Sequence, residues 1–379
     1  RSMPAGTRGG WLFFELEGLT YGTPSYDAVF ITHSHRDHMG LINKIMEQIP
    51  VYVEEKTLKI YHLTCDFCGK ERIKRKVNTF KLSSKNKKAN TIFHNKDLKI
   101  TPYLIDHSAY NSCMYKVESE NKTILHTGDF RSHGRKGHLF VKTLKEIGKV
   151  NLLITEGTTL TRKNEKLIRE QDIEEKALEI MKKYDQILIL QSSTNIDRTV
   201  SFIKASLKTN KNFILDLFSY HLNQMINFNI KVDNKKIFVY KPIKYKNKPN
   251  WFKKRYCTVP LNSNFFPNFT MEIKESMCKD IKMLLKKGHL SNACLIYSMW
   301  DGYLKKEENL KTMLNELKKM KIDYYELHTS GHASKEAMSL LNKITNPDKT
   351  IIIHTENKEL GKTIFNHVED IKDHDTLII

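Results

Sequence analysis

The chain has 379 residues, which at roughly 100 to 200 residues per domain predicts two domains, or one large domain with an insertion. Its 40% hydrophobic and 10% aromatic residues are typical of a globular protein and exclude a disordered or fibrous chain. The formal net charge of +20 at pH 7 favours a polyanionic partner such as nucleic acid. No apolar run approaches the ~18 residues of a bilayer span, and residues 1–10 lack a secretory apolar core. We therefore expect a cytoplasmic protein with no membrane partner.

Short apolar runs of strand length alternate with helical patterns along most of the chain, which predicts an α/β protein. The run 28–31 predicts a buried strand, followed by a histidine-rich turn and an amphipathic helix over about 39–48. Further strands are predicted over 98–104, 112–118, 122–127, 150–155, 186–190, 213–217, 293–297, 322–327 and 351–353. Further helices are predicted over 170–183, from 195, and over 270–286 and 306–319. From residue 166 the alternation indicates a second, parallel sheet.

Only two of the six cysteines, Cys65 and Cys68, are spaced as a pair. A single Cys-x-x-Cys cannot complete a four-ligand zinc site by itself. We interpret the cysteines mainly as packing residues of a protein from a reducing compartment.

The strongest functional signal is Thr32-His33-Ser34-His35-Arg36-Asp37-His38, at the end of the first predicted buried strand. Side chains at i and i+2 of an extended segment share a face, so His33 and His35 can hold one metal ion. Asp37 and His38, where a helix begins, turn toward a second ion. Imidazole and carboxylate ligands suit zinc or manganese, and two such ions can share a hydroxide.

Three other predicted strands end in candidate ligands. His107, within an Asp-His pair, follows the strand at 98–104, Asp129 follows 122–127, and His354 follows 351–353. A carboxylate such as Asp129 can bridge two cations, because each oxygen can bind one of them. Taken singly, each residue is as well explained by a polar surface position. As a set with the first cluster they predict a two-metal site.

These motifs together resemble the metallo-β-lactamase superfamily. The sequence has its His-x-His-x-Asp-His, then Asp-His-Ser, then Thr127-Gly128-Asp129. Later segments resemble the three signature motifs of the β-CASP group, the ribonuclease J-like nucleic-acid processing hydrolases: residues 153–159 (LITEGTT), 328–333 (HTSGHA) and 352–356 (IIHTE). The spacing of His332 and His354 also matches that group.

The resemblance implies a fold, domain limits and a cofactor. We expect an αββα metallo-β-lactamase sandwich from residues 1–165 and 322–379, interrupted by an inserted α/β β-CASP domain at 166–321, with a cleft between them. The implied cofactor is a pair of divalent metal ions, zinc or manganese. The resemblance assigns His33, His35 and His107 to one ion, Asp37, His38 and His354 to the other, and Asp129 as the bridge.

The resemblance also assigns catalytic roles. Glu156 hydrogen-bonds a metal-ligating histidine, His332 contacts the scissile phosphate, and His354 favours RNA over DNA. We expect a metal-bound hydroxide, oriented by Asp37, to attack phosphorus while His332 stabilises the developing charge or protonates the leaving oxygen.

Three segments are candidate substrate contacts. The loop His328, Thr329, Ser330 and Gly331 offers backbone N–H groups to a phosphate, or is an ordinary helix cap. Ser192, Ser193, Asn195 and Arg198 resemble the family's channel-lining segment, or form an N-cap beside a solvated arginine. The segment 240–255 interleaves cations with aromatic rings, including Lys244, Tyr245 and Trp251, which suits a single strand or a basic surface loop.

The predicted function is a metal-dependent ribonuclease acting on single-stranded RNA, with exonuclease and endonuclease modes both open. A DNA nuclease of the same superfamily is one alternative. A catalytically silent RNA-binding subunit is another, because the Asp-x-Gly turn of the family does not occur in residues 1–32. The resemblance also allows a homodimer.

Overall fold

The computed structural model describes residues 15–83, 85–95, 97–162, 168–226, 236–240, 266–372 and 375–379. The chain forms two compact units. Unit 1 combines Arg1–Leu167 with Gly331–Ile379, and unit 2 is Ile168–Ser330. None of the helices in the described ranges has both the length and the apolar character that crossing a membrane requires.

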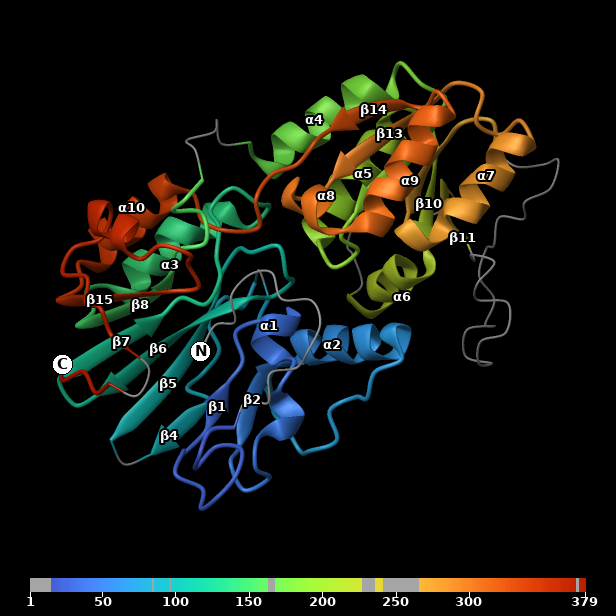
Figure 1. The fold of residues 1–379 in the computed structure, drawn as a ribbon. Coiled ribbons are helices and arrows are strands. Elements are labelled where there is room, and N and C mark those ends of the chain that lie inside the picture. The colour runs from blue at the N-terminus through green and yellow to red at the C-terminus, as the bar shows by residue number, and fades with distance from the viewer. Residues whose placement is uncertain are drawn as a thin grey trace. The chain divides into compact units, whose positions relative to one another are not determined.

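Unit 1 contains two sheets (Figure 1). The smaller is parallel, with β1 (Val29–Phe30), β2 (Val51–Glu54) and β3 (Asn78–Phe80) in that order. The larger is mixed and has the order β15 (Lys349–Ile353), β8 (Leu152–Glu156), β7 (Lys122–His126), β6 (Cys113–Ser119), β5 (Leu98–Leu104), β4 (Phe93–Asn95). β15 therefore joins the sheet beside β8, although almost 200 positions separate the two strands in the sequence.

The helices of unit 1 are short, apart from α2. They are α1 (Arg36–Met39), η1 (Ile42–Lys44), α2 (Glu55–Cys68), η2 (Gly137–Leu139), α3 (Phe140–Ile147), α10 (Lys335–Thr345) and η7 (Glu359–Thr363).

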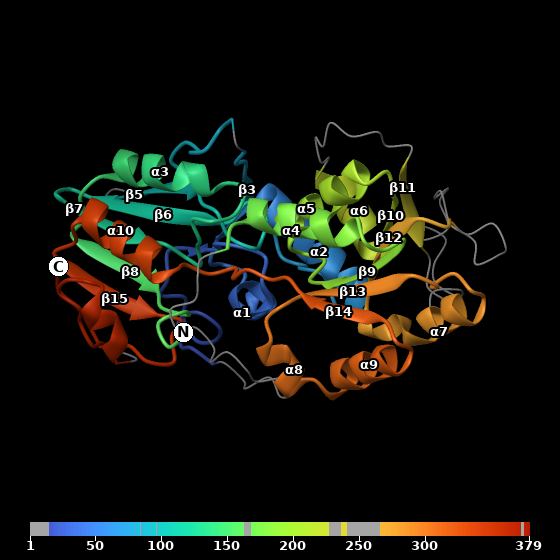
Figure 2. The ribbon, with the colours of Figure 1, turned by 90° about the horizontal axis from the view of Figure 1, so that it is seen from above.

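Alternating side chains of the larger sheet build two separate cores, because successive residues of a strand point to opposite faces. Tyr103 and Met114, which are paired across β5 and β6, pack in one cluster with α3 and α10. The next pair, Leu104 and Cys113, packs in another cluster with Phe80 of the smaller sheet. A third cluster joins the outer face of the smaller sheet to α1 and α2. The layers are thus helix, sheet, sheet, helix, which confirms the predicted αββα sandwich (Figure 2).

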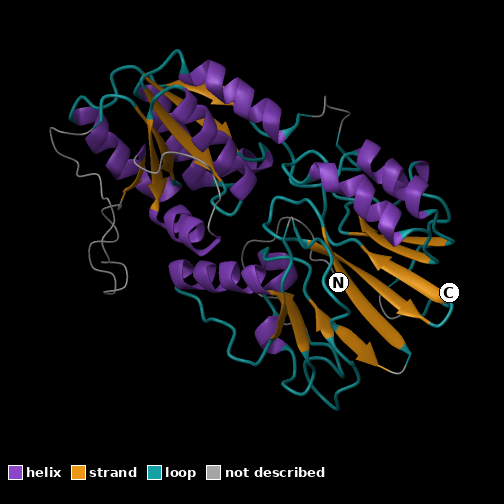
Figure 3. Cartoon of the chain, turned by 180° about the vertical axis from the view of Figure 1, so that it is seen from behind, coloured by secondary structure: helices purple, strands orange, loops and turns teal. Residues whose placement is uncertain are grey.

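Unit 2 is a parallel sheet with helices on both faces (Figure 3). Its strand order is β11 (Ile237–Tyr240), β10 (Asn212–Asp216), β12 (Phe269–Ile273), β9 (Gln186–Gln191), β13 (Ala293–Ser298), β14 (Asp323–Glu326). Its helices are α4 (Glu170–Met181), α5 (Ile196–Lys208), α6 (Leu217–Ile226), η6 (Glu275–Met277), α7 (Cys278–Lys286), α8 (Gly302–Lys306) and α9 (Glu308–Lys319). This is the inserted α/β domain expected from the alternation of apolar runs.

Three predicted elements differ from the structure. The helix predicted over 39–48 is replaced by α1, which ends at Gly40, and the single turn η1. The helix predicted over 270–286 begins only at Cys278, because residues 269–273 form the central strand β12. The strand predicted over 322–327 was assigned to the first domain, but β14 pairs with β13. Unit 2 therefore continues past residue 321.

Candidate metal centre

Nine side chains of unit 1 converge on one place, and all seven predicted metal ligands are among them. They form three overlapping groups, within each of which the ligand atoms all lie within 4.8 Å of one another. The groups are His33, His35, His107 and Asp129; Asp129, Glu156, His332 and His354; and Asp37, His38 and His354. Asp129 belongs to two groups and His354 to two, so the three groups form one continuous cluster.

Strand register brings these side chains together. The seven predicted ligands follow the carboxyl ends of β1, β5, β7 and β15. Glu156 is the last residue of β8, and His332 lies shortly before α10. The β15–β8 register places Ile353 beside Glu156, so His354 comes next to the loop that follows β8. The conformation of His354 itself is unusual, since its φ of +52° is in the left-handed region that non-glycine residues seldom adopt.

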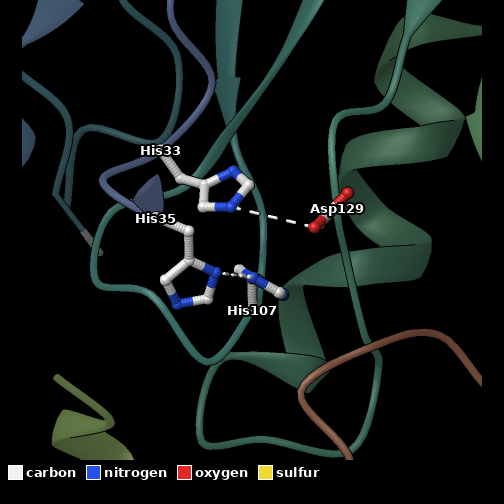
Figure 4. Close-up of side chains that lie close together, drawn as sticks. All are labelled: His33, His35, His107 and Asp129. Atoms are coloured by element: carbon white, nitrogen blue, oxygen red, sulfur yellow. Dashed lines mark hydrogen bonds and ion pairs between the residues drawn. The ribbon is translucent and has the colours of Figure 1, made fainter. Parts of the chain in front are cut away.

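Figure 4 shows His33, His35, His107 and Asp129 directed toward a common space. Nε2 of His33 lies 3.8 Å from Oδ2 of Asp129, and Nε2 of His107 lies 3.2 Å from Nδ1 of His35. Nε2 of His33 is buried and has no hydrogen-bond partner in the described part of the chain. A buried ring nitrogen without a hydrogen-bond partner requires an explanation, and a role as a metal ligand provides one.

Three histidines are oriented by a contact on Nδ1. Nδ1 of His107 donates to the carbonyl oxygen of Gly331 at 2.6 Å, which leaves the lone pair on Nε2. Thr158 Oγ1 donates to the carbonyl oxygen of His354 and lies 2.7 Å from its Nδ1, so it accepts from this nitrogen. Oγ1 of Thr32 lies 3.0 Å from Nδ1 of His33. Such contacts fix the tautomer and aim of metal-binding imidazoles.

The predictions gave Thr158 and the Gly331 carbonyl no such role. Thr158 belongs to one of the signature-like motifs, which is a signal that could have identified it. Its partner His354, however, is 196 positions away in the sequence. Gly331 approaches the site so closely that an added Cβ would lie 2.5 Å from Oγ of Ser108. Only glycine fits there without a shift of its neighbours.

Glu156 and His332, two members of the cluster, form a hydrogen-bonded pair. Nδ1 of His332 donates to Oε2 of Glu156 at 2.9 Å. Oε1 of Glu156 accepts from the backbone N–H groups of Phe130 and Ala333, at 2.8 and 3.4 Å. Glu156 thus orients His332 through its Nδ1, and the backbone holds Glu156 itself in place.

The electrostatics favour neutral imidazoles at His33, His35 and His107 and a charged carboxylate at Asp129, whereas His38 is favoured as a cation and must release its proton to bind a metal ion. Burial lowers the pKa of His33 and His107 well below the ordinary value, and that of His35 to about 4. Burial opposes ionisation of Asp129, but the hydrogen bond from His38 and the surrounding imidazoles hold its pKa well below the usual range. Burial also lowers the pKa of His38, but contacts with Asp129 and Asp37 outweigh it and raise the value to about 10. Neutral imidazole and carboxylate are the forms that bind metal ions.

Comparisons with known proteins agree with this geometry. Residues 14–186 match the family model of the β-lactamase superfamily domain. A curated relative named ribonuclease J, from Mycoplasma genitalium, is 26% identical over 96% of this chain and 63% of its own length. The chain is thus similar to β-lactamase superfamily domains over residues 14–186 and to a ribonuclease J over most of its length.

Two further matches extend beyond residues 14–186. A ribonuclease J from Mycoplasma pneumoniae is 26% identical over 90% of this chain and 60% of its own length. The chain thus spans less than two thirds of both curated relatives. A crystal structure of a protein of unknown function from Enterococcus faecalis V583 shares the fold, with a TM-score of 0.76 and 18% identity over 97% of this chain and 84% of that one. The resemblance predicted from the motifs is confirmed by these matches.

The donor set of unit 1 fits a divalent metal ion. It combines buried neutral imidazoles with carboxylates, which suit zinc, manganese and similar ions. The orphaned Nε2 of His33 and the Nδ1 contacts of His107 and His354 point the same way. Cys65 and Cys68 belong to none of the potential metal-binding groups found among the described residues.

The predicted substrate contacts are less uniform. In unit 2, Ser192 is exposed and Ser193 donates to Oδ2 of Asp216 at 3.0 Å. Asn195 caps α5 by accepting from the backbone N–H of Arg198. The predicted phosphate loop at 328–331 does not lead directly into a helix, since α10 begins at Lys335 with Ser334 as its N-cap. Lys244, Tyr245 and Trp251 lie outside the described residues.

Arg198 needs a correction. It was predicted to contact the substrate or the solvent, but its side chain is fully buried in unit 2. Its guanidinium pairs with both oxygens of Glu170 and donates to the carbonyl oxygen of Thr329, and Nη1 lies 3.5 Å from Nδ1 of His328. Arg198 therefore supports the loop at 328–329 from inside the unit, because the buried charge is satisfied by the carboxylate and the carbonyl.

Proposed function

We propose that this protein is a metal-dependent hydrolase that cleaves phosphodiester bonds of single-stranded RNA. The observation that carries the proposal is the convergence of nine imidazole and carboxylate side chains from loops far apart in the sequence. The charge of +20 suits a polyanionic substrate, and the name ribonuclease J of both curated relatives favours RNA over DNA.

Two divalent ions fit the cluster, with zinc favoured and manganese as the alternative. His33, His35 and His107 would hold one ion, Asp37, His38 and His354 the other, and Asp129 both. Such ions, when bound, supply a nucleophile from water at neutral pH and stabilise charge on a phosphate. Asp129 faces both sets of ligands: its Oδ2 lies 3.8 Å from Nε2 of His33, and its Oδ1 lies 3.9 Å from Nδ1 of His354.

The chain's own residues would orient the reactants and move the proton. Asp37 lies 3.3 Å from Nε2 of His354 and is partly exposed, so it can orient a water molecule at the edge of the cluster. His332 donates through Nδ1 to Glu156, which directs the opposite edge of the ring, with Nε2, away from Glu156. The Glu156 carboxylate raises the pKa of His332 against the opposing effect of burial, and a protonated His332 can stabilise charge or protonate the leaving oxygen.

End-labelled single-stranded RNA and DNA test this proposal. We expect the purified chain, after chelation and reloading with Zn²⁺ or Mn²⁺, to cleave RNA and to lose this activity in excess chelator. Asp129→Asn should abolish cleavage, while Asp97→Asn, on an exposed turn of the same unit, should leave it unchanged. The pattern of labelled products would separate exonuclease from endonuclease cleavage.

Other outcomes would contradict the proposal. Cleavage of DNA but not RNA would favour the DNA nuclease. RNA binding that needs no metal and gives no product would favour a silent subunit. The homodimer stays a prediction, which light scattering of the same preparation can test.

A further inference from the structure

In the parallel sheet of unit 2, the connections that follow β9 and β12 run toward opposite edges of the sheet, from β9 to β10 and from β12 to β13. The strands β9 and β12 are adjacent, with Glu272 opposite Ile189. The helix after β9, α5, packs through Phe202 into the apolar cluster on one face, whereas the helix after β12, α7, packs through Ile281 into the cluster on the other face. In open α/β sheets, ligands bind at the carboxyl ends of two such strands.

Two buried polar side chains stand at this point. Gln191 ends β9 and is 2% exposed, and Glu272 in β12 is 0% exposed. Nε2 of Gln191 donates to Oε1 of Glu272 at 2.7 Å and to Oγ1 of Thr199 at 2.8 Å. Oε1 of Gln191 and Oε2 of Glu272 are buried and have no hydrogen-bond partner among the residues that the structure describes. Two adjacent acceptors without a donor are rare in protein interiors.

The neighbouring cation is already engaged. Nζ of Lys274 lies 3.1 Å from Oδ2 of Asp216 and donates to the backbone carbonyl oxygen of Gln191 at 3.1 Å. Oδ2 of Asp216 also accepts from the hydroxyl of Ser219 at 3.0 Å. Asp216, Glu272 and Lys274 together carry a formal charge of −1 when all are ionised. Burial, and then the Asp216 carboxylate, raise the pKa of Glu272, and they outweigh the lowering effect of Lys274 and of the contacts with Ser219 and Gln191.

We propose that the carboxyl ends of β9 and β12 bind a monovalent alkali cation through Oε2 of Glu272 and Oε1 of Gln191. Carboxylate and amide oxygens suit a hard cation rather than a transition metal. Because both side chains are almost fully buried, a bound cation would have to be small and without its hydration shell. One positive charge balances the cluster. Mg²⁺ would overcompensate it, and Mg²⁺ also retains several waters that this buried site does not accommodate. The proposal does not depend on the nuclease activity.

Hydrogen exchange of the full chain provides a local test. The exchange of peptides covering 186–191 and 269–273 is compared in potassium, sodium and tetramethylammonium chloride at equal ionic strength. A bound ion stabilises the folded strands by mass action, so we expect K⁺ or Na⁺ to slow their exchange about tenfold, with saturation. Peptides covering β5 and β6 of unit 1 serve as the internal reference.

Matched variants separate the ion from general salt effects. Glu272→Gln keeps the size of the side chain but removes its charge, and it should abolish the difference between the salts. Glu179→Gln, at an exposed position of α4 in the same unit, should retain it. Equal exchange in all three salts would overturn the proposal. Protection by Mg²⁺ alone would also overturn it. So would slow exchange of wild type at low pH together with equally slow exchange of Glu272→Gln at neutral pH, because this result would show that a proton occupies the site.

A second measurement does not require the variant to fold. Crystals of the wild-type chain soaked in rubidium chloride should show an anomalous peak between Gln191 and Glu272. An ordered water without anomalous signal at that position would overturn the proposal.

Discussion

The hydrogen bond on one ring nitrogen decides what each histidine of the cluster can do. His107 and His354 direct Nδ1 to an oxygen of the protein, which leaves Nε2 for a metal ion. His332 also directs Nδ1 to an oxygen, Oε2 of Glu156, but it is not one of the seven predicted ligands. Imidazole side chains thus have two roles in this site, as metal ligands and as a proton donor or charge stabiliser, and the partner on Nδ1 distinguishes them.

The first prediction concerns the oxygen that holds His354. Thr158→Val keeps the shape of the side chain but removes the hydroxyl that accepts from Nδ1. The ring then loses its fixed tautomer and aim, and we expect metal affinity to fall roughly 10- to 100-fold. Titration with Zn²⁺ by calorimetry would measure this. Thr64→Val, which removes a hydroxyl bonded to the backbone of α2, is the control and should bind metal like wild type.

The second prediction separates His332 from the ligands. His332→Ala should reduce RNA cleavage by roughly 10²- to 10⁴-fold, because a proton donor or charge stabiliser is lost. The metal content, measured by atomic absorption, should not change. His94→Ala, at an exposed position of β4, should retain full activity. Loss of metal from His332→Ala would instead make His332 a ligand, as its grouping with Asp129 and His354 also allows.

At the scale of elements, the cluster is a product of strand ends. Parallel pairing of β7 with β8 and of β8 with β15 sets the carboxyl ends of three strands side by side, so the loops after them meet. The sequence allowed this to be predicted because each candidate ligand follows a short apolar run. The strand over 98–104 was even predicted with the bounds that β5 has.

Elsewhere local patterns were misleading. In residues 269–273 the polar Thr270 and Glu272 alternate with apolar residues, yet all five are buried in the centre of the sheet of unit 2. Their burial depends on neighbours distant in the sequence, which no local periodicity reveals. The helix predicted over 39–48 failed for a local reason, since α1 ends at Gly40. The Nδ1 partners of His107 and His354 could not be found either, because Gly331 and Thr158 are distant from them in the sequence.

The third prediction concerns an anchor between β2 and its surroundings. The buried carboxylate of Glu54 caps α2 by accepting from Thr57, and it also accepts from the Asn111 side chain in the loop that follows His107. Glu54→Ala removes the cap and leaves buried donors without partners. We expect a loss of about 2 kcal/mol or more in the free energy of unfolding, measured in urea.

The matched control is the next residue along the chain. Glu55 forms an ion pair with Lys59 on the surface of α2, and such pairs contribute little. Glu55→Ala should cost less than about 0.5 kcal/mol. Equal losses in the two variants would show that Glu54 does not anchor this region.

At the scale of the whole molecule, the donors are confined to one of the two units although the chain crosses between the units twice. All nine side chains belong to unit 1, and His332 and His354 reach it only after the chain has completed unit 2. β15 and α10 complete the large sheet and its helical layer from the same final segment. The metal centre and the core of unit 1 therefore need both segments of the discontinuous unit.

This separation leads to the last prediction. Adding Zn²⁺ or Mn²⁺ to chelator-treated protein should slow hydrogen exchange in peptides covering β7, β8 and β15 by tenfold or more, because binding to the folded state stabilises the strands whose ends carry the donors. Peptides covering β9 and β13 of unit 2 should not respond, since they carry none of the nine groups. Asp129→Asn removes the carboxylate shared by two of the groups and should abolish the response. Equal protection of both units, or a response that persists in Asp129→Asn, would show that the ions act elsewhere than at this cluster.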